Sequence, residues 1–218
     1  MRHVHQPEAD AARSLSDQAY YRLRELIITL ELPPGSAINE RDLMERTKLG
    51  RTPIREALRT LANERLVEIF PRRGVLVAGV NAGDLAGLSE VRRLLEPPAA
   101  RAAAERRTAA DRAETEGLLA ELAQADGDER SLIELDQRIH RHVYRCTHNP
   151  FLSAALGEHY LLSLRIWFLA LDRVEQLGDA VREHRELLEA IRDGDGDAAE
   201  AAMLRHVDGF ERAMRAVL

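Results

Sequence analysis

Cysteine is almost absent from this sequence of 218 residues, which contains only Cys146. A single cysteine excludes a disulfide framework within the chain and suits a reducing cytosol, although a lone thiol could still pair between two chains. No apolar run approaches the roughly 18 residues of a membrane-spanning helix, and the N-terminus does not resemble a signal peptide. The longest apolar stretch, LLSLRIWFLALD, contains Arg165. We therefore expect a soluble, cytoplasmic protein that does not enter a membrane.

Aromatic residues make up only 4% of the sequence, and runs of β-branched residues are few. Ala, Leu, Glu and Arg dominate instead, and these residues favour helices. Hydrophobic residues account for 45%, which is enough to build a core in one large domain or two modest ones. The composition predicts a mainly α-helical fold.

Charge is distributed unevenly along the chain. The net charge is −6 overall, which would argue against nucleic-acid binding if it were spread evenly. Residues 13–80, however, carry 12 Lys and Arg against 9 Asp and Glu, a net charge of +3. Residues 81–218 carry 18 against 26, a net charge of −8. This asymmetry separates a mildly basic part from an acidic one, and residues 1–12, which are polar and patternless, are expected to be a disordered arm.

The basic part reads as a winged helix-turn-helix domain over residues 13–80. Ser16 can cap a first helix, which ends before LPPG because proline cannot continue it. Two short helices are expected next, and then LVEIF and VLVAGV form a β-hairpin joined by PRRG. The arginines of this turn, Arg72 and Arg73, suit phosphate or minor-groove contact, although basic turn residues are common. The three helices are predicted at residues 16–30, 40–47 and 52–63.

The acidic part, residues 81–218, reads as an all-α bundle of six or seven helices. NAGD at residues 81–84 supplies a helix cap and a first-turn acid. Pro97 and Pro98 are expected to kink or split the first helix. Later helix starts are marked by three further capping boxes: Thr108 with Asp111, Ser131 with Glu134, and Asp197 with Glu200.

The segment RTPIREALRTLANE, residues 51–64, has the pattern of an amphipathic helix with a basic face. Arg51, Arg55 and Arg59 recur every four residues and share one side, while apolar residues take the other. The major groove admits such a helix, and an arginine there can contact both acceptors of a guanine. Arg51 and Thr52 lie at its N-terminal end, where recognition helices meet base edges. Three arginines alone would suit a solvated face, but the flanking helix and hairpin favour DNA binding.

The segment LIELDQRIHRH, residues 132–142, places Asp136 and His140 inside the apolar stripe of a helix. At about 100° per residue, both fall in the middle of the apolar arc. A carboxylate in such a place costs several kcal/mol unless a metal ion or a salt-bridge partner compensates it. The apolar arc consists of Leu132, Ile133, Ile139 and Val143.

His184 and His206 also lie on the apolar sides of their helices. One such histidine is more often a satisfied core residue, but three with an aspartate one turn away from the first are poorly explained in that way. Neutral imidazoles and a carboxylate suit zinc, nickel or a similar divalent ion, and Asp136 and His140 could bind it from one helix. The other histidines are read as surface, cap or arm residues: His142, His148, His3 and His5.

The stretch LPPGSAINERDLMERTKLGRTPIREALRTLANERLVEIFPRRGVLV resembles the DNA-binding domain of the GntR family of bacterial transcription regulators. The resemblance covers about residues 15–79 and rests on PG, an E-R-x-L-like core, R-T-P-x-R-E-A-L, and L-V before a glycine-bearing wing. Two departures are Gly50, where the family usually has Ser or Thr, and Arg65, where it usually has Gly. The first removes a phosphate-binding hydroxyl. By resemblance, the DNA-contacting positions are Arg41, Arg51, Thr52 and Arg55, with Arg73 and Gly74 at the wing tip.

Residues 82–217 resemble the FadR-type ligand-binding domain called FCD, in which D-x-x-x-H is followed by two histidines on later helices. The resemblance implies a divalent metal ion, zinc with nickel or manganese as alternatives, whose open positions accept a small organic acid. Arg92 matches an arginine that points toward the effector, with Arg93 as the alternative if the helical phase is shifted. Arg165 is a second effector candidate, although a buried ion pair or a dimer contact would explain it as well. The implied metal ligands are Asp136, His140, His184 and His206.

The leading hypothesis is a transcription factor, most simply a repressor, that binds a palindromic operator as a homodimer and responds to a small carboxylate. A metal-dependent enzyme is the second hypothesis, because such a site could activate water. No separate nucleophile or base motif accompanies the histidines, and an enzyme has no use for a basic recognition helix, so we expect no enzymatic activity. In a third hypothesis the helical part only dimerises and its histidines are core residues.

Overall fold

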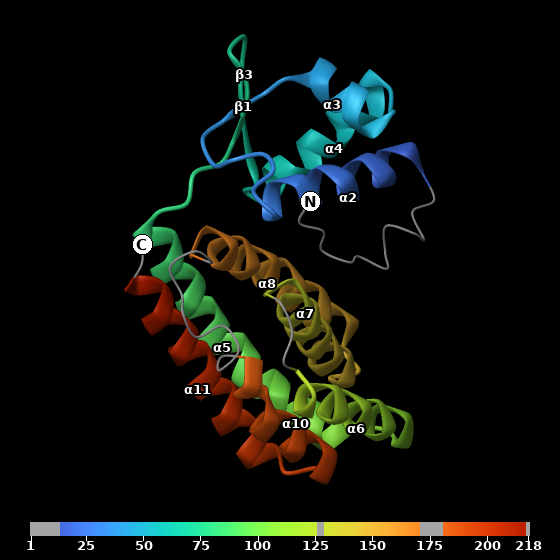
Figure 1. Cartoon of the computed structure of the whole chain (residues 1–218), viewed down its shortest axis with the longest axis vertical. Helices are drawn as coiled ribbons and strands as arrows, with labels where there is room; N and C mark the ends of the chain where they lie inside the picture. The colour runs from blue at the N-terminus through green and yellow to red at the C-terminus, as the bar shows by residue number, and fades with distance from the viewer. Residues whose placement is uncertain (1–13, 126–128, 171–180, 217–218) are drawn as a thin grey trace. The chain divides into compact units, whose positions relative to one another are not determined.

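The computed structural model describes residues 14–125, 129–170 and 181–216 (Figure 1). The chain divides into two compact units, Met1–Val80 and Asn81–Leu218. The arm predicted for residues 1–12, with His3 and His5, lies outside the described residues. The predicted fold class is confirmed: the structure is mainly α-helical, with a small antiparallel sheet in the N-terminal unit and a bundle of helices in the C-terminal unit.

The N-terminal unit is a winged helix-turn-helix with one strand more than the sequence predicts. Its sheet has the order β1-β3-β2, and both pairings are antiparallel. The extra strand is β1, where Ala37 pairs with Leu76 and Ile38 with Val75. Two residues are too few to show an alternating pattern, so this strand exists only because β3 offers it a partner. The elements are α2 (Leu15–Ile28), β1 (Ala37–Ile38), α3 (Glu40–Thr47), α4 (Arg51–Asn63), β2 (Val67–Phe70) and β3 (Gly74–Val77).

Three predicted helix starts are wrong, two of them by two residues. The helix predicted to start at the capping box of Ser131 and Glu134 already includes Glu129, so Ser131 lies inside it. The first helix is capped by Ser14 in a capping box with Asp17, while the hydroxyl of Ser16 hydrogen-bonds to Glu56. The last helix is capped by Asp195 instead of Asp197. In both cases a second acid or hydroxyl stands two positions from the predicted cap, and only the backbone geometry selects which side chain reaches the free N–H groups.

The turn after α4 has the hydrogen bonds of a Schellman motif. The N–H of Leu66 donates to the carbonyl of Leu61 at 2.9 Å, and the N–H of Arg65 donates to the carbonyl of Ala62 at 3.1 Å. This motif requires a left-handed residue, and Arg65 fills that position with φ of +60°. The glycine usual at this position in the family would adopt the same conformation without a steric cost.

The C-terminal unit contains six helices among the described residues. Pro97 and Pro98 lie inside the first of them, so of the two predicted outcomes, a kink or a split, the split is wrong. Two missing N–H groups cost hydrogen bonds, but the well-packed helix continues on both sides of them. None of the helices in the described ranges combines the length and the apolarity that crossing a bilayer requires. The six are α5 (Ala82–Arg106), α6 (Ala109–Ala123), α7 (Glu129–Cys146), α8 (Pro150–Ala170), α10 (His184–Asp193) and α11 (Gly196–Arg215).

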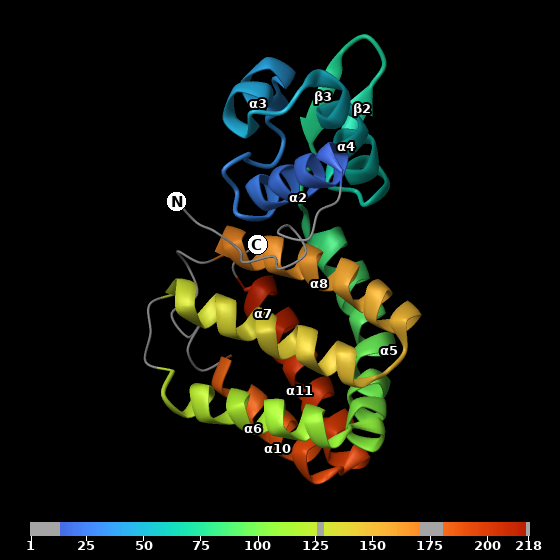
Figure 2. The same ribbon diagram turned by 90° about the vertical axis from the view of Figure 1, so that its right-hand side faces the viewer.

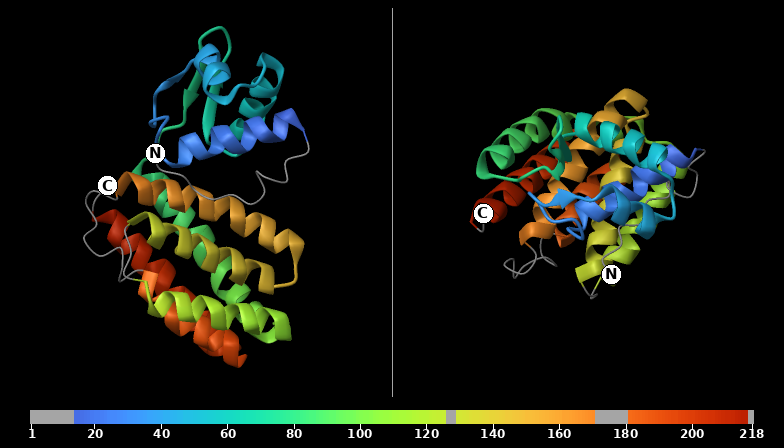
Figure 3. Two further views of the ribbon diagram at one scale, coloured as in Figure 1. Left: turned by 45° about the vertical axis from the view of Figure 1, so that its right-hand side comes forward. Right: turned by 90° about the horizontal axis from the view of Figure 1, so that it is seen from above.

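Helix α5 is the axis of this unit, because α7, α8, α10 and α11 all pack on it. It lies side by side with α11 (Figure 1). Helices α8, α7 and α6 follow one another across the unit (Figure 2; Figure 3, left). Close packing on α5 is possible because its C-terminal half presents a run of small buried residues: Ala99, Ala100, Ala102, Ala103 and Ala104.

The N-terminus of α6 is tied to the turn between α7 and α8. Thr108 and Asp111 form the predicted capping box, and the carboxylate of Asp111 also accepts a hydrogen bond from His148 Nε2 at 2.8 Å. Burial acts to raise the pKa of Asp111, but the hydrogen bonds from Thr108 and His148 outweigh it and lower the pKa to about 2. The ionised carboxylate therefore stabilises the folded state.

Arg65→Gly is expected to stabilise the N-terminal unit by about 0.5–1 kcal/mol. Glycine adopts the left-handed conformation without strain, and this gain exceeds the cost of its greater entropy in the unfolded chain. Hydrogen–deuterium exchange of the α4 amides measures the change as slower exchange. The matched control is Arg59→Gly, in the middle of the same helix, which should speed exchange by costing about 1 kcal/mol. Equal acceleration in both variants would contradict the assignment of strain to Arg65.

Asp111→Ala is expected to lower the free energy of unfolding of the C-terminal unit by about 1–2 kcal/mol at pH 7. The folded-state pKa of Asp111 is depressed, so its contribution is full above the ordinary value of about 3.9 and is lost as pH falls toward 2. The difference between variant and wild type should therefore narrow between pH 5 and pH 2. Denaturation followed by the fluorescence of Trp167, the chain's one tryptophan, measures it. Glu158→Ala, at an exposed position of α8, is the control.

Candidate functional site

The six residues predicted to contact DNA are all exposed on the N-terminal unit. Arg51, Thr52 and Arg55 occupy the first turns of α4, whose opposite face is buried through Ile54, Ala57, Leu58 and Leu61. Arg41 lies in the first turn of α3, and Arg73 and Gly74 lie at the turn between β2 and β3.

The N-terminal end of α4 is suited to an anionic partner. Gly50 precedes the helix and provides no side-chain cap, so the first N–H groups of α4 are not covered by a side chain of that residue. A Cβ on Gly50 would meet only Pro53 Cδ at 3.9 Å, an ordinary contact, so the fold itself does not require glycine here. Arg55 holds its guanidinium toward α3 through Glu40, with Nε 3.0 Å from each carboxylate oxygen.

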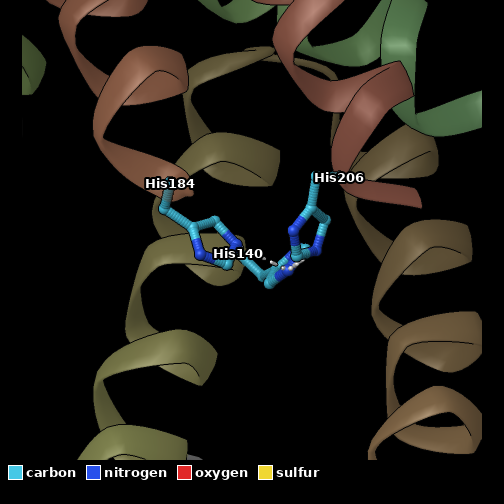
Figure 4. A group of neighbouring side chains, drawn as sticks. All are labelled: His140, His184 and His206. Carbon is cyan, nitrogen blue, oxygen red and sulfur yellow. Dashed lines mark hydrogen bonds between the residues drawn. The ribbon is translucent and has the colours of Figure 1, made fainter. Parts of the chain in front are cut away.

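Three histidines converge in the interior of the C-terminal unit. His140 comes from α7, His184 is the first residue of α10, and His206 comes from α11 (Figure 4). The Nε2 atom of His140 lies 3.2 Å from Nε2 of His184 and 3.2 Å from Nε2 of His206. One ligand atom from each residue lies within 4.8 Å of those of the other two. All three side chains are buried.

Asp136 lies beside this histidine triad and is nearest to His184. Its Oδ1 atom is 3.6 Å from His184 Nε2 and 3.9 Å from His140 Nε2. Its other oxygen, Oδ2, accepts a hydrogen bond from the hydroxyl of Tyr160 at 2.7 Å. This bond fixes the orientation of the carboxylate, with Oδ1 on the side of the histidines. The structure thus brings together all four residues predicted from the sequence to bind metal.

Hydrogen bonds on the far side of the rings orient two of the histidines. His184 Nδ1 is 3.1 Å from the carbonyl of Val181, and a carbonyl can only accept, so Nδ1 carries the hydrogen and Nε2 keeps its lone pair. His140 Nδ1 is 3.1 Å from the hydroxyl of Tyr144, one helical turn further along α7. His184 therefore turns the lone pair of Nε2 toward the centre of the triad, and Nε2 of His140 lies at the same centre.

The electrostatics of the site call for a cation. Burial, reinforced by the neighbouring His184 and Arg92, holds the pKa values of His140 and His206 well below the ordinary value, so both imidazoles are neutral. Burial also raises the pKa of Asp136, whose Oδ1 has no hydrogen-bond partner in the described part of the chain. A buried carboxylate facing imidazole lone pairs is costly by itself, and a positive ion would compensate all of these groups.

The spacing of the nitrogens fits a metal ion. Ligands about 2.0–2.1 Å from a tetrahedral zinc ion stand roughly 3.3 Å apart, close to the two Nε2 separations of 3.2 Å. A hydrogen bond could satisfy only one of these two contacts, because His140 Nε2 carries at most one hydrogen. The donor set therefore fits a divalent cation better than a network of histidines bonded to one another.

Of the three arginines considered for the effector, Arg92 is the one beside the triad. It is buried, its Nε and Nη2 atoms bind Glu96 at 2.5 and 3.3 Å, and its guanidinium lies 4.9 Å from the ring centre of Phe210. Arg93 instead lies on the surface and pairs with Asp208 and Glu211 of α11. The helical phase of α5 thus directs Arg92 inward. Two nitrogens of its guanidinium, Nε and Nη2, are already bound by Glu96.

Arg165 is buried in α8. Burial lowers the pKa of its guanidinium to about 10, while the charge of Asp84 at the start of α5 acts in the opposite direction. Asp84, at the N-terminal end of α5, acts on the charge of Arg165, near the C-terminal end of α8. At the other end of α5, Arg106 donates a hydrogen bond to the carbonyl of Thr147, just before α8 begins. Helices α5 and α8 thus run in opposite directions, and Arg165 lies toward the N-terminal end of α5.

The surface position predicted for His142 is wrong. Its side chain is buried between α6 and α7, with Nε2 2.8 Å from Thr115 Oγ1 and Nδ1 3.1 Å from Arg145 Nη2. Helix α6 covers this side of α7, so α7 is buried on two faces and its apolar stripe does not mark its only buried side. His148, by contrast, is exposed at the turn between α7 and α8, as predicted.

Three further residues of the site were missed from the sequence. Tyr144 follows His140 by four residues, a spacing that could have revealed it, and Glu96 follows Arg92 by the same interval. Tyr160 reaches Asp136 from another helix. Its contact depends on how α8 packs on α7, for which a single sequence contains no signal.

Comparisons with known proteins agree with this arrangement. The family model described as "Bacterial regulatory proteins, gntR family" matches residues 15–77, and the model described as "FCD domain" matches residues 87–209. The galactonate operon transcriptional repressor of Escherichia coli K12 is 32% identical over 93% of this chain and 97% of its own. The HTH-type transcriptional repressor RspR of the same strain is 25% identical over 96% and 93%.

The solved structure of E. coli McbR/YncC matches with a TM-score of 0.83 at 22% identity, covering 94% of this chain and 99% of that one. The relatives found by sequence are regulators of transcription and not enzymes. Since the FCD model alone matches more than half of the sequence and the galactonate repressor aligns along nearly all of it, the chain belongs to the GntR family of bacterial transcriptional regulators, with an FCD domain as its C-terminal unit.

Proposed function

We propose that this regulator is a repressor whose binding to operator DNA is modulated by a small organic acid at a divalent metal site in the FCD domain. The observation that carries the proposal is the convergence of three buried imidazole nitrogens beside Oδ1 of Asp136, an oxygen that accepts no hydrogen bond from the described residues. We propose that it acts in the cytoplasm, as a homodimer on a palindromic operator.

The operator is read by the exposed basic end of α4. Arg51 and Thr52 lie where a helix inserted in the major groove meets base edges, and Arg55 is held beside them by Glu40. Arg41 on α3 and Arg73 at the wing turn contact phosphates of the DNA backbone in this proposal. Two such units related by a two-fold axis would read a palindrome, because each α4 occupies one half-site.

The metal is held by Asp136, His140, His184 and His206, and zinc fits the donor set, with nickel or manganese as alternatives. A divalent ion there supplies a Lewis acid to which a carboxylate can bind. Four protein ligands close an ordinary zinc site, so the acid requires a fifth or sixth position. Arg92 lies beside the triad, and Arg165 is a second candidate to contact the effector.

The names of the relatives support both the repressor role and an organic acid as the effector. Two of them are called repressors, and one of these controls a galactonate operon. Galactonate is a sugar acid, which combines a carboxylate with hydroxyl groups. We infer that a small carboxylate of this chemical kind is the effector class for the present chain, and that its binding shifts the balance between conformations that bind the operator well and poorly.

Metal analysis of protein purified without chelator is expected to find about one divalent ion per chain. His184→Ala and His206→Ala should each reduce the metal content severalfold, because each removes one of the converging nitrogens. His159→Ala is the control, since its ring bonds to the carbonyl of Ala155 within α8. A wild-type content far below one ion per chain would overturn the metal-based mechanism and leave the histidines as core residues.

Arg51→Ala is expected to weaken operator binding by about 1–3 kcal/mol, tenfold or more, while leaving the metal content unchanged. The DNA for this test is a site that the purified protein selects from random sequences, and the affinity is measured by fluorescence anisotropy at fixed salt. Arg112→Ala, on the exposed face of α6, is the matched control. Failure to enrich any palindrome, or equal affinity of both variants, would count against α4 as the recognition helix.

A further inference from the structure

The hydroxyl group of Ser89 has no hydrogen bond to any residue that the structure describes. The residue lies in α5 with 1% of its surface exposed, and its Oγ has no partner within the described residues. Five serine and threonine hydroxyls at other positions, in a helix or directly after one, donate to the carbonyl four residues earlier. These hydroxyls belong to Thr29, Thr47, Thr60, Thr115 and Ser163.

A buried hydroxyl without a partner is unfavourable, so Ser89 requires an explanation. Alanine would occupy the same place without this cost, and α5 uses alanine at many of its other buried positions. The partner of this hydroxyl therefore lies outside the described residues, as a bound ligand or a water molecule.

A second unsatisfied group lies one turn away on the same side of the helix. Ser89, Arg92 and Glu96 fall within about 60° of one another on α5, and Arg92 Nη1 also has no hydrogen-bond partner in the described ranges. Glu96 Oε2 is 3.8 Å from His140 Nδ1, so this polar strip begins at the histidine triad and ends at Ser89. Arg92 and Ser89 are separated by about 4.5 Å along the helix axis.

This polar strip is not suited to bind a second carboxylate, because the charge of Arg92 is already paired with Glu96. Glu96 engages the Nε and Nη2 side of Arg92 and neutralises its charge, so Arg92 offers only Nη1 to a ligand. Nη1 can only donate, whereas the Ser89 hydroxyl both donates and accepts. A hydroxyl group on the ligand matches this pair, because it can accept from Arg92 and exchange a hydrogen bond with Ser89.

We propose that Ser89 and Arg92 Nη1 form hydrogen bonds with hydroxyl groups on the carbon chain of the acid. Ser89 thereby makes the regulator selective for hydroxylated carboxylates over carboxylates without hydroxyl groups. This rests on the proposed function, in which the carboxylate itself binds at the metal. Selectivity follows because a plain alkyl chain would leave two buried polar groups unpaired, and a site built to bond a hydroxyl rejects an analogue lacking it.

The test compares gluconate and galactonate with hexanoate, which has the same chain length without hydroxyls, on the full-length zinc-loaded protein. Isothermal titration calorimetry measures affinity, and a thermal melt of the ligand-free protein measures stability. The wild type should bind at least one of the hydroxy acids tenfold or more tightly than hexanoate. Ser89→Ala should cut that preference at least fivefold by weakening the hydroxy acid alone. It should also leave the melting temperature of the ligand-free protein unchanged or raise it by about 1–3 °C.

Ser163→Ala is the matched control, because its hydroxyl already bonds to the carbonyl of His159. It should leave the preference for hydroxy acids intact. An unchanged preference in Ser89→Ala, with both acid types still binding, overturns the role of Ser89 while acid sensing stands. The same role is overturned if Ser89→Ala lowers the ligand-free melting temperature and leaves selectivity intact, since the hydroxyl is then satisfied by a structural water. If no carboxylate binds the metal-loaded protein, acid sensing itself fails and this proposal fails with it.

Discussion

The burial of ionisable groups inside the C-terminal unit is the constraint on which the rest of the structure depends. Asp136 and the three histidines are buried together, and a few ångströms away Arg92 and Glu96 form an ion pair with almost no exposure to solvent. A low-dielectric interior tolerates such groups only when every charge is balanced. Arg92 and Glu96 balance each other, whereas a divalent cation, as we propose, would balance the histidine triad and Asp136.

This constraint also joins helices that are distant in the sequence. The proposed metal ligands come from α7, α10 and α11, so a bound ion would hold these three helices together, and α5 contacts all of them. An acid bound to that ion would therefore act on the packing of the whole unit. Such coupling is the physical basis by which a small acid could change the behaviour of a DNA-binding domain on the same chain.

The sequence predicted much of the site because helical periodicity alone shows when a polar residue lies on an apolar face. Asp136, His140, His184 and His206 were found in this way. The same rule failed for His142, because α7 is buried on two faces and periodicity marks only the more apolar one. It left Arg92 and Arg93 undecided, since neighbouring residues differ by only about 100° and the choice depends on how α11 packs on α5.

The sequence by itself determined the helical composition, the basic face of α4, the wing and the four metal-binding candidates, because each depends on local pattern or residue type. Only the tertiary structure decided that Nε2 of His140 lies 3.2 Å from Nε2 of both His184 and His206, and that Glu96 binds the Nε and Nη2 side of Arg92. It also decided that the Ser89 hydroxyl has no hydrogen-bond partner among the described residues. These facts depend on distances between helices far apart in the chain, and no local pattern encodes such distances.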